Sequence, residues 1–232
     1  MKNKYKHIFF DLDHTLWDYD ANANETLIDI YEKYSFKKMG FFSVEEFLTA
    51  FHQENEILWT QYNQGIIPKS AIRQQRFVKV FEAVGLPLLY QPPNINQEFV
   101  QQCPFHTHVI DHTFEILDYL FPQYEMHIIT NGFDDIQHIK LAQSGLDKYF
   151  GHVITSESCG ARKPSEKIFQ HALALSNSDV ERSIMIGDNA QTDILGAREV
   201  GMDHIFFNPH KKSLPDFETI EIKSLLEIKD IL

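Results

Sequence analysis

Short apolar segments alternate with helical patterns along much of this chain, and this alternation limits the possible fold more than any other feature. Five segments predict buried strands: His7–Phe10, Met126–Thr130, His152–Thr155, Ser183–Ile186 and His204–Phe207. Helical patterns cover Thr113–Phe121, Asp134–Ser144, Ser165–Leu175 and Thr192–Val200. Strands that alternate with helices indicate βαβ units, so we predict an α/β fold with a Rossmann-like, three-layer core around a parallel sheet.

One long stretch interrupts this rhythm directly after the first strand. From Trp17 to Cys103 the patterns are helical throughout, and the segment Gln91–Pro104 is rich in Gln, Asn and Pro, which favours a boundary there. We therefore expect a core domain made of residues 1–16 and 104–232. Residues 17–103 are expected to form an inserted, all-helical cap of the four-helix-bundle type.

The composition allows a sizeable core and argues against some classes of partner. The chain has 232 residues, of which 43% are hydrophobic, and a formal net charge of −12. Such a charge argues against a nucleic-acid polymer as partner. The two cysteines show no framework spacing, and no apolar run approaches the roughly 20 residues of a membrane span. We expect a cytoplasmic protein that acts on a small molecule, with no membrane association and no obligate protein partner evident.

Two carboxylates follow the first strand, one residue apart. Side chains alternate along a strand, so Asp11 and Asp13 leave its end pointing roughly the same way. Two carboxylates so near to each other repel, which raises the pKa of at least one of them unless a cation lies between them. A pair that merely capped a turn would keep this repulsion, whereas a divalent metal would relieve it.

Functional groups follow the next three strands as well. Thr130 and Asn131 stand at the end of the second strand, Lys163 lies in the loop after the third, and Asp188 comes directly after the fourth. Ligands of open α/β sheets bind outside the carboxyl ends of the strands. Each of these residues also has an ordinary structural interpretation, such as a helix cap, a solvated lysine or a turn. Their occurrence at successive strand ends favours one shared site.

The residue types suit phosphoryl transfer. A carboxylate such as Asp11 can attack phosphorus and carry the phosphoryl group as an acyl phosphate. The hydroxyl of Thr130, a backbone N–H near Asn131 and the ammonium of Lys163 can hold phosphate oxygens. Asp11, Asp188 and the carbonyl of Asp13 offer the oxygen ligands that Mg²⁺ prefers. The carboxylate of Asp13 is then available for proton transfer, which is typically worth about 10²–10⁴-fold in rate.

The order of these groups resembles the haloacid dehalogenase superfamily of aspartyl-phosphate phosphatases. Its four motifs match DLDHT at 11–15, IITNG at 128–132, Lys163 in ARKPSEKIF, and GDNAQTD at 187–193, and its C1-type cap matches the helical insertion. The resemblance implies that Asp11 is the nucleophile and Asp13 the general acid and base. It also implies that Asp188 ligates Mg²⁺, while Asp193 orients Lys163 or a metal-bound water.

Longer runs are similar to pyrimidine 5′-nucleotidases of the bacterial house-cleaning type. These runs are TNGFDDIQHIKLAQSGLDKYF, TSESCGARKPSEKIF, GDNAQTDILGAREVGM and, in the cap, LWTQYNQG and IRQQRF. This resemblance implies a Mg²⁺-dependent hydrolase of canonical or noncanonical pyrimidine nucleoside monophosphates. The cap would then select the leaving group, and the candidates for contacting a base or ribose are Trp17, Asp18, Tyr19 and Asn22.

Other activities stay open at this point. Asp13 argues against the dehalogenases proper, which need no acid at that position. A phosphatase or mutase for a small sugar phosphate or phosphoglycolate shares the same core motifs, and cap lysines leave a phosphonatase possible. A non-enzymatic phospho-accepting module would use similar residues, but there the phosphorylated Asp stands apart from the acidic pair. Here Asp11 and Asp13 share one loop.

Overall fold

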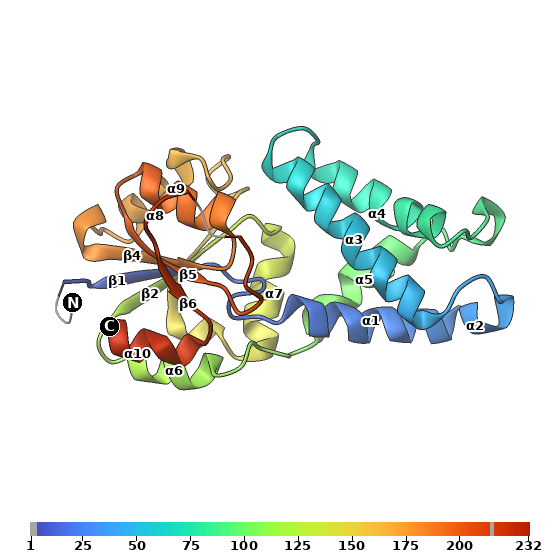
Figure 1. The fold of residues 1–232 in the computed structure, drawn as a ribbon, viewed down its shortest axis with the longest axis horizontal. Helices are drawn as coiled ribbons and strands as arrows, with labels where there is room; N and C mark the ends of the chain where they lie inside the picture. The colour runs from blue at the N-terminus through green and yellow to red at the C-terminus, as the bar shows by residue number, and fades with distance from the viewer. Residues whose placement is uncertain (1–3, 214–215) are drawn as a thin grey trace. The chain divides into compact units, whose positions relative to one another are not determined.

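A six-stranded parallel sheet forms the centre of the α/β core. The computed structural model describes residues 4–213 and 216–232, and Figure 1 shows the arrangement of their helices and strands. The strand order is β3-β2-β1-β4-β5-β6, and every neighbouring pair is parallel. The strands are β1 (His7–Phe10), β2 (Glu125–Thr130), β3 (Phe150–Thr155), β4 (Ser183–Gly187), β5 (Asp203–Phe207) and β6 (Ile220–Ile222).

Helices cover both faces of this sheet. Figure 1 shows α8 and α9 on one face and α6 and α10 on the other. The core helices are α6 (Thr113–Leu120), α7 (Asp134–Ser144), α8 (Glu166–Leu175), α9 (Leu195–Glu199) and α10 (Ile228–Ile231). The predicted three-layer α/β core with a parallel sheet is thus confirmed.

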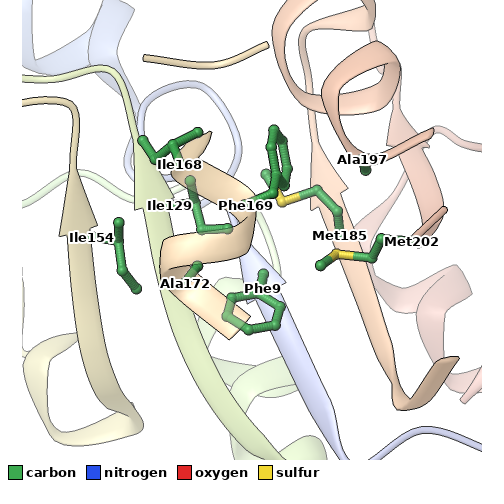
Figure 2. Packing of buried hydrophobic residues seen from close by; sticks show 9 residues of the cluster. All are labelled: Phe9, Ile129, Ile154, Ile168, Phe169, Ala172, Met185, Ala197 and Met202. Atoms are coloured by element: carbon green, nitrogen blue, oxygen red, sulfur yellow. The ribbon is translucent and has the colours of Figure 1, made fainter. Parts of the chain in front are cut away.

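The apolar contacts between the sheet and α8 and α9 explain why these segments pack together. Phe9 of β1 and Met185 of β4 lie among residues from α8 and α9, as Figure 2 shows. The buried members of this cluster are Phe9, Ile129, Ile154, Ile168, Phe169, Ala172, Met185, Ala197 and Met202. Every residue of β1 is buried, because the strand is covered on both faces and has sheet neighbours on both sides.

Strand β1 also lies where the winding of the sheet reverses. It pairs with β2 on one side and with β4 on the other, although these strands are far apart in the sequence. The crevice at such a reversal is the usual ligand site of an open α/β sheet. The loops at this edge of the sheet are therefore the first place to look for a ligand site.

Residues 20–106 form a second compact unit, and the first comprises residues 1–19 and 107–232. Helices of the second unit are α1 (Tyr19–Lys33), α2 (Phe36–Met39), α3 (Val44–Asn63), α4 (Lys69–Ala83) and α5 (Ile95–Gln102). Its interior is rich in phenylalanine: Phe47 of α3 stacks on Phe81 of α4 at 6.0 Å between ring centroids. A capping box between Ser43 and Glu46 begins α3.

Three elements differ from the sequence-based expectations. The segment Gln91–Pro104, in which we expected a domain boundary, contains the separate helix α5, which buries Ile95 and Phe99. Strand β6 was not predicted, because three residues at a sheet edge give little periodicity. The helix expected over Thr192–Val200 begins earlier, as a π-helical turn at Ala190–Ile194, and continues as α9.

The described residues also contain short 3₁₀ helices at Leu88–Tyr90, Cys103–Phe105, Asp147–Tyr149, Val180–Arg182 and Leu225–Glu227. Within residues 4–213 and 216–232, we find no helix with both the length and the apolar character needed to cross a bilayer.

Candidate active site

Three neighbouring strands bring their carboxyl ends together at this site. Asp11 directly follows β1, and its backbone N–H donates to the carbonyl of Ile186 at 2.9 Å, so the first loop residue still follows β4. Thr130 is the last residue of β2, and Asp188 directly follows β4. Because β1 lies between β2 and β4, Asp11, Thr130 and Asp188 meet at the same edge of the sheet although they are far apart in the sequence.

A buried ion-pair triad forms the centre of the site. The ammonium of Lys163 lies 2.6 Å from Oδ1 of Asp11 and 2.7 Å from Oδ1 of Asp193, and it donates to the carbonyl of Ile129 at 2.6 Å. Only 1% of the Lys163 side chain is exposed. Burial lowers the pKa of Lys163, but the charges of Asp11 and Asp193 outweigh it and hold the pKa above the usual lysine range. The lysine is therefore a permanent cation beside Asp11.

Negative charge exceeds positive charge around Asp11. The carboxylates of Asp11, Asp188 and Asp193 offer oxygens that all lie within 4.8 Å of one another. Burial raises the pKa of Asp11, Lys163 opposes this rise, and the charges of Asp193 and Asp188 add to it, so the pKa stays above its ordinary value. Lys212, whose side chain is 52% exposed, lies 2.8 Å from Oδ2 of Asp188. An all-oxygen cluster with surplus negative charge suits a divalent cation such as Mg²⁺.

The loop after β2 is tied to the segment that carries Lys163. The side-chain amide of Asn131 donates to the carbonyl of Lys163 at 3.0 Å, and its oxygen accepts the backbone N–H of Lys163 at 2.8 Å. The hydroxyl of Thr130 accepts the N–H of Gly132 at 3.0 Å. The side chain of Asn131 thus joins two loops, and the sequence had suggested only a backbone contribution near this position.

Asp13 is held by two residues that sequence reasoning missed. Nζ of Lys140 lies 2.5 Å from Oδ1 of Asp13, and Nε2 of Gln137 donates to Oδ2 at 2.9 Å. Burial raises the pKa of Asp13, but the charge and hydrogen bond of Lys140 and the hydrogen bond of Gln137 outweigh it and lower the pKa. A signal was present in α7, whose buried positions are Gln137, Lys140, Leu141 and Ser144. Polar residues where an amphipathic helix should be apolar indicate a polar neighbour.

The candidate specificity residues lie in different surroundings. Trp17 is fully buried, and the ammonium of Lys140 lies 4.2 Å from its ring centroid and 5.5 Å from that of Tyr19. The half-buried Asp18 donates its backbone N–H to the carbonyl of His108 at 3.1 Å. Asn22 is buried within α1 of the second unit. The structure thus places the rings of Trp17 and Tyr19 beside Lys140.

Comparisons with known proteins show to which family the chain is similar. The sequence profile of haloacid dehalogenase-like hydrolases matches residues 8–207. Pyrimidine 5′-nucleotidase YjjG of Escherichia coli is 30% identical over 99% of this chain and 98% of its own, and PynA of Streptococcus pneumoniae is 30% identical over 97% and 95%. The solved structure of the HAD-hydrolase YfnB from Bacillus subtilis, bound to magnesium, is similar in fold, with a TM-score of 0.86, 24% identity and 99% coverage of both chains.

Proposed function

The chain belongs to the haloacid dehalogenase-like hydrolase family and is a phosphomonoester hydrolase, and on that premise we propose that it acts through a phosphorylated Asp11. The observation that carries this proposal is the buried pair of Asp11 and Lys163, whose atoms lie 2.6 Å apart. A carboxylate and a permanent ammonium side by side give a nucleophile next to a group that binds the phosphoryl oxygens.

In the first step, a carboxylate oxygen of Asp11 attacks phosphorus and the bond to the leaving oxygen breaks. Lys163 neutralises charge on the phosphoryl oxygens, and the hydroxyl of Thr130 with backbone N–H groups near Asn131 holds them. Asp13 must carry a proton for this step, although Lys140 and Gln137 lower its pKa, and it gives that proton to the leaving oxygen, so the product departs as an alcohol. In this proposal Asp193 orients Lys163, since a carboxylate oxygen of Asp193 lies 2.7 Å from the ammonium of Lys163.

In the second step, water attacks the phosphorus of the acyl phosphate. Asp13, now ionised, takes a proton from that water, and Asp11 is released together with inorganic phosphate. One carboxylate therefore serves as acid and then as base, which regenerates its starting state.

We propose Mg²⁺ as the cofactor, bound by the carboxylates of Asp11 and Asp188 and the carbonyl of Asp13. The ion would supply positive charge to the phosphoryl oxygens and reduce repulsion between the phosphoryl group and Asp11. Burial raises the pKa of Asp11, and the charges of Asp193 and Asp188 raise it further against the opposing effect of Lys163; these two neighbouring carboxylates support the proposal of a cation at this position.

We propose pyrimidine nucleoside monophosphates as the substrates. Support comes from two relatives named as pyrimidine 5′-nucleotidases, which match nearly the whole chain and not only the core motifs. Trp17, Asp18, Tyr19 and Asn22, which follow the Asp11–Asp13 loop in the chain, are the residues proposed to select the leaving group.

Phosphate release from a panel of phosphomonoesters tests both parts of the proposal. The panel contains pyrimidine and purine nucleoside monophosphates, sugar phosphates and phosphoglycolate, each with Mg²⁺ and with EDTA. We expect Mg²⁺-dependent release, highest for pyrimidine nucleotides, and none from Asp11→Asn. The matched control is Asp230→Asn, the same change at an exposed position on α10. Activity that persists in Asp11→Asn contradicts the mechanism, whereas preference for a sugar phosphate contradicts only the substrate.

A further inference from the structure

Two buried side chains of α7 bind the carboxylate of Asp13, one on each oxygen. Lys140 contacts Oδ1 at 2.5 Å, and Gln137 donates to Oδ2 at 2.9 Å. Both residues are buried, with 0% of Gln137 and 5% of Lys140 exposed. We propose that Gln137 and Lys140 are positioning residues that fix the proton-transfer carboxylate of Asp13, an inference that rests on the proposed function.

Gln137 connects proton transfer with phosphate binding. Its Nε2 donates to the hydroxyl of Thr130 at 2.8 Å as well as to Asp13. An amide nitrogen carries two hydrogens, so one NH₂ group can make both bonds. The same group therefore sets the distance between the residue that holds a phosphate oxygen and the residue that protonates the leaving oxygen.

Gly132 makes this contact possible. A Cβ atom at position 132 would lie 1.7 Å from Nε2 of Gln137 and 2.5 Å from its Cδ. These distances are far below van der Waals contact, so any larger residue would displace the amide. The position of Gln137 thus explains why a glycine stands at 132 in the IITNG segment.

Two aromatic rings lie close to the ammonium of Lys140. It lies 4.2 Å from the ring centroid of Trp17, which is fully buried, and 5.5 Å from that of Tyr19. A buried ammonium is costly unless it is paired, and here a carboxylate and the faces of two rings compensate. These contacts restrict the position of the Lys140 ammonium, and the ion pair with Lys140 in turn restricts the carboxylate of Asp13.

A carboxylate with both oxygens bound cannot rotate freely about its terminal torsion, which is otherwise broad. Proton transfer in the transition state depends on alignment, and it contributes about 10²–10⁴-fold in rate. The contribution is large for an alkyl leaving group and small for p-nitrophenolate, which leaves without a proton. Loss of Asp13 alignment should therefore slow hydrolysis of an alkyl phosphate more than hydrolysis of p-nitrophenyl phosphate, whereas a general loss of structure should slow both.

The test compares kcat/KM for uridine monophosphate and for p-nitrophenyl phosphate, since kcat/KM reports the steps up to release of the leaving group. For Gln137→Leu and Lys140→Met we expect kcat/KM to fall at least about tenfold on the nucleotide and less than about threefold on p-nitrophenyl phosphate. Lys140→Arg, which keeps the charge, should recover part of the loss. Controls are Gln143→Leu, exposed on the same helix, and the exposed Lys148→Met.

Asp13→Asn separates this inference from the proposed function on which it rests. We expect this variant to lose nucleotide hydrolysis selectively as well. If Asp13→Asn affects both substrates equally, or neither, the proposed role of Asp13 is wrong. If Asp13→Asn is selective but Gln137→Leu slows both substrates alike, or neither, only the positioning role is wrong. Gln137→Leu removes an uncharged donor and leaves the ion pair of Lys140 and Asp13 in place, so it decides the outcome even if Lys140→Met does not fold.

Discussion

Removal of the buried lysine should cost the protein a large part of its stability. Lys163→Met deletes the cation that pairs with Asp11 at 2.6 Å and with Asp193 at 2.7 Å, inside a site where Lys163 is 1% exposed. Breaking a buried pair by removing one partner typically costs about 3–5 kcal/mol, because the remaining charge is buried without compensation. For a chain of this size, that corresponds to a fall in Tm of about 6–20 °C.

The pH dependence of the loss follows from the direction of the pKa shifts. Lys163 lowers the pKa of both Asp11 and Asp193, and burial and neighbouring carboxylates raise them. Without the lysine, the folded-state pKa of each carboxyl lies further above its unfolded value. A folded state that binds more protons than the unfolded state loses stability as pH rises. The deficit of Lys163→Met should therefore be largest near neutral pH and shrink on acidification.

Thermal melts in EDTA at about pH 7.5 and about pH 5.5 measure this difference. Lys229→Met is the control, because it removes a surface ion pair with Glu115, whose atoms lie 2.7 Å apart on partly exposed side chains. Because solvent screens such a pair, its loss should lower Tm much less than the loss of Lys163 does. A loss below about 1 kcal/mol for Lys163→Met, or a deficit that grows on acidification, would refute the electrostatic reasoning.

Other consequences can be measured independently. Gly132→Ala should lower kcat/KM for a nucleotide as strongly as Gln137→Leu, because its Cβ would displace that amide; steady-state kinetics that match the wild type would contradict this. Excess Mg²⁺ should raise Tm, by an amount equivalent to about 2.7 kcal/mol at a hundredfold excess over Kd, and Asp188→Asn should abolish the rise in scanning fluorimetry. Phe169→Ala, in the core of Figure 2, should lower the free energy of unfolding by about 3–5 kcal/mol in urea titration.

Elements with a strong local pattern were predicted almost to the residue. Strand β1 and helix α7 begin and end where the sequence indicated, because the apolar run of β1 stops at Asp11 and Gly145 ends α7 in the left-handed conformation. Helix α5 was missed within Gln91–Pro104, where prolines and amides dominate and only Ile95 and Phe99 are buried apolar residues. The early start of the helix at Ala190 is a π-helical turn, whose wider spacing has no counterpart in a 3.6-residue pattern.

The order of strand ends in the sequence was enough to assemble most of the site. Asp11, Thr130 and Asp188 were expected to share one edge, because parallel strands present all their carboxyl ends on the same side of a sheet. The contact between Lys163 and Asp11 joins residues 152 positions apart, yet it follows from the same rule. Local sequence determines that Asp11 and Lys163 each follow a strand, and the order of the strands in the sheet brings the two side chains into contact.

Only the tertiary structure decided what surrounds Asp13. The spacing of Gln137 and Lys140 shows that they share a face of α7, but periodicity gives burial and not the identity of a neighbour. Their contacts with a carboxylate 124 and 127 residues earlier depend on how closely α7 approaches the end of β1. The sequence by itself thus determined which chemical groups meet at the sheet edge. The packing of one helix decided how the carboxylate that transfers the proton is held, because that requires distances that no local pattern contains.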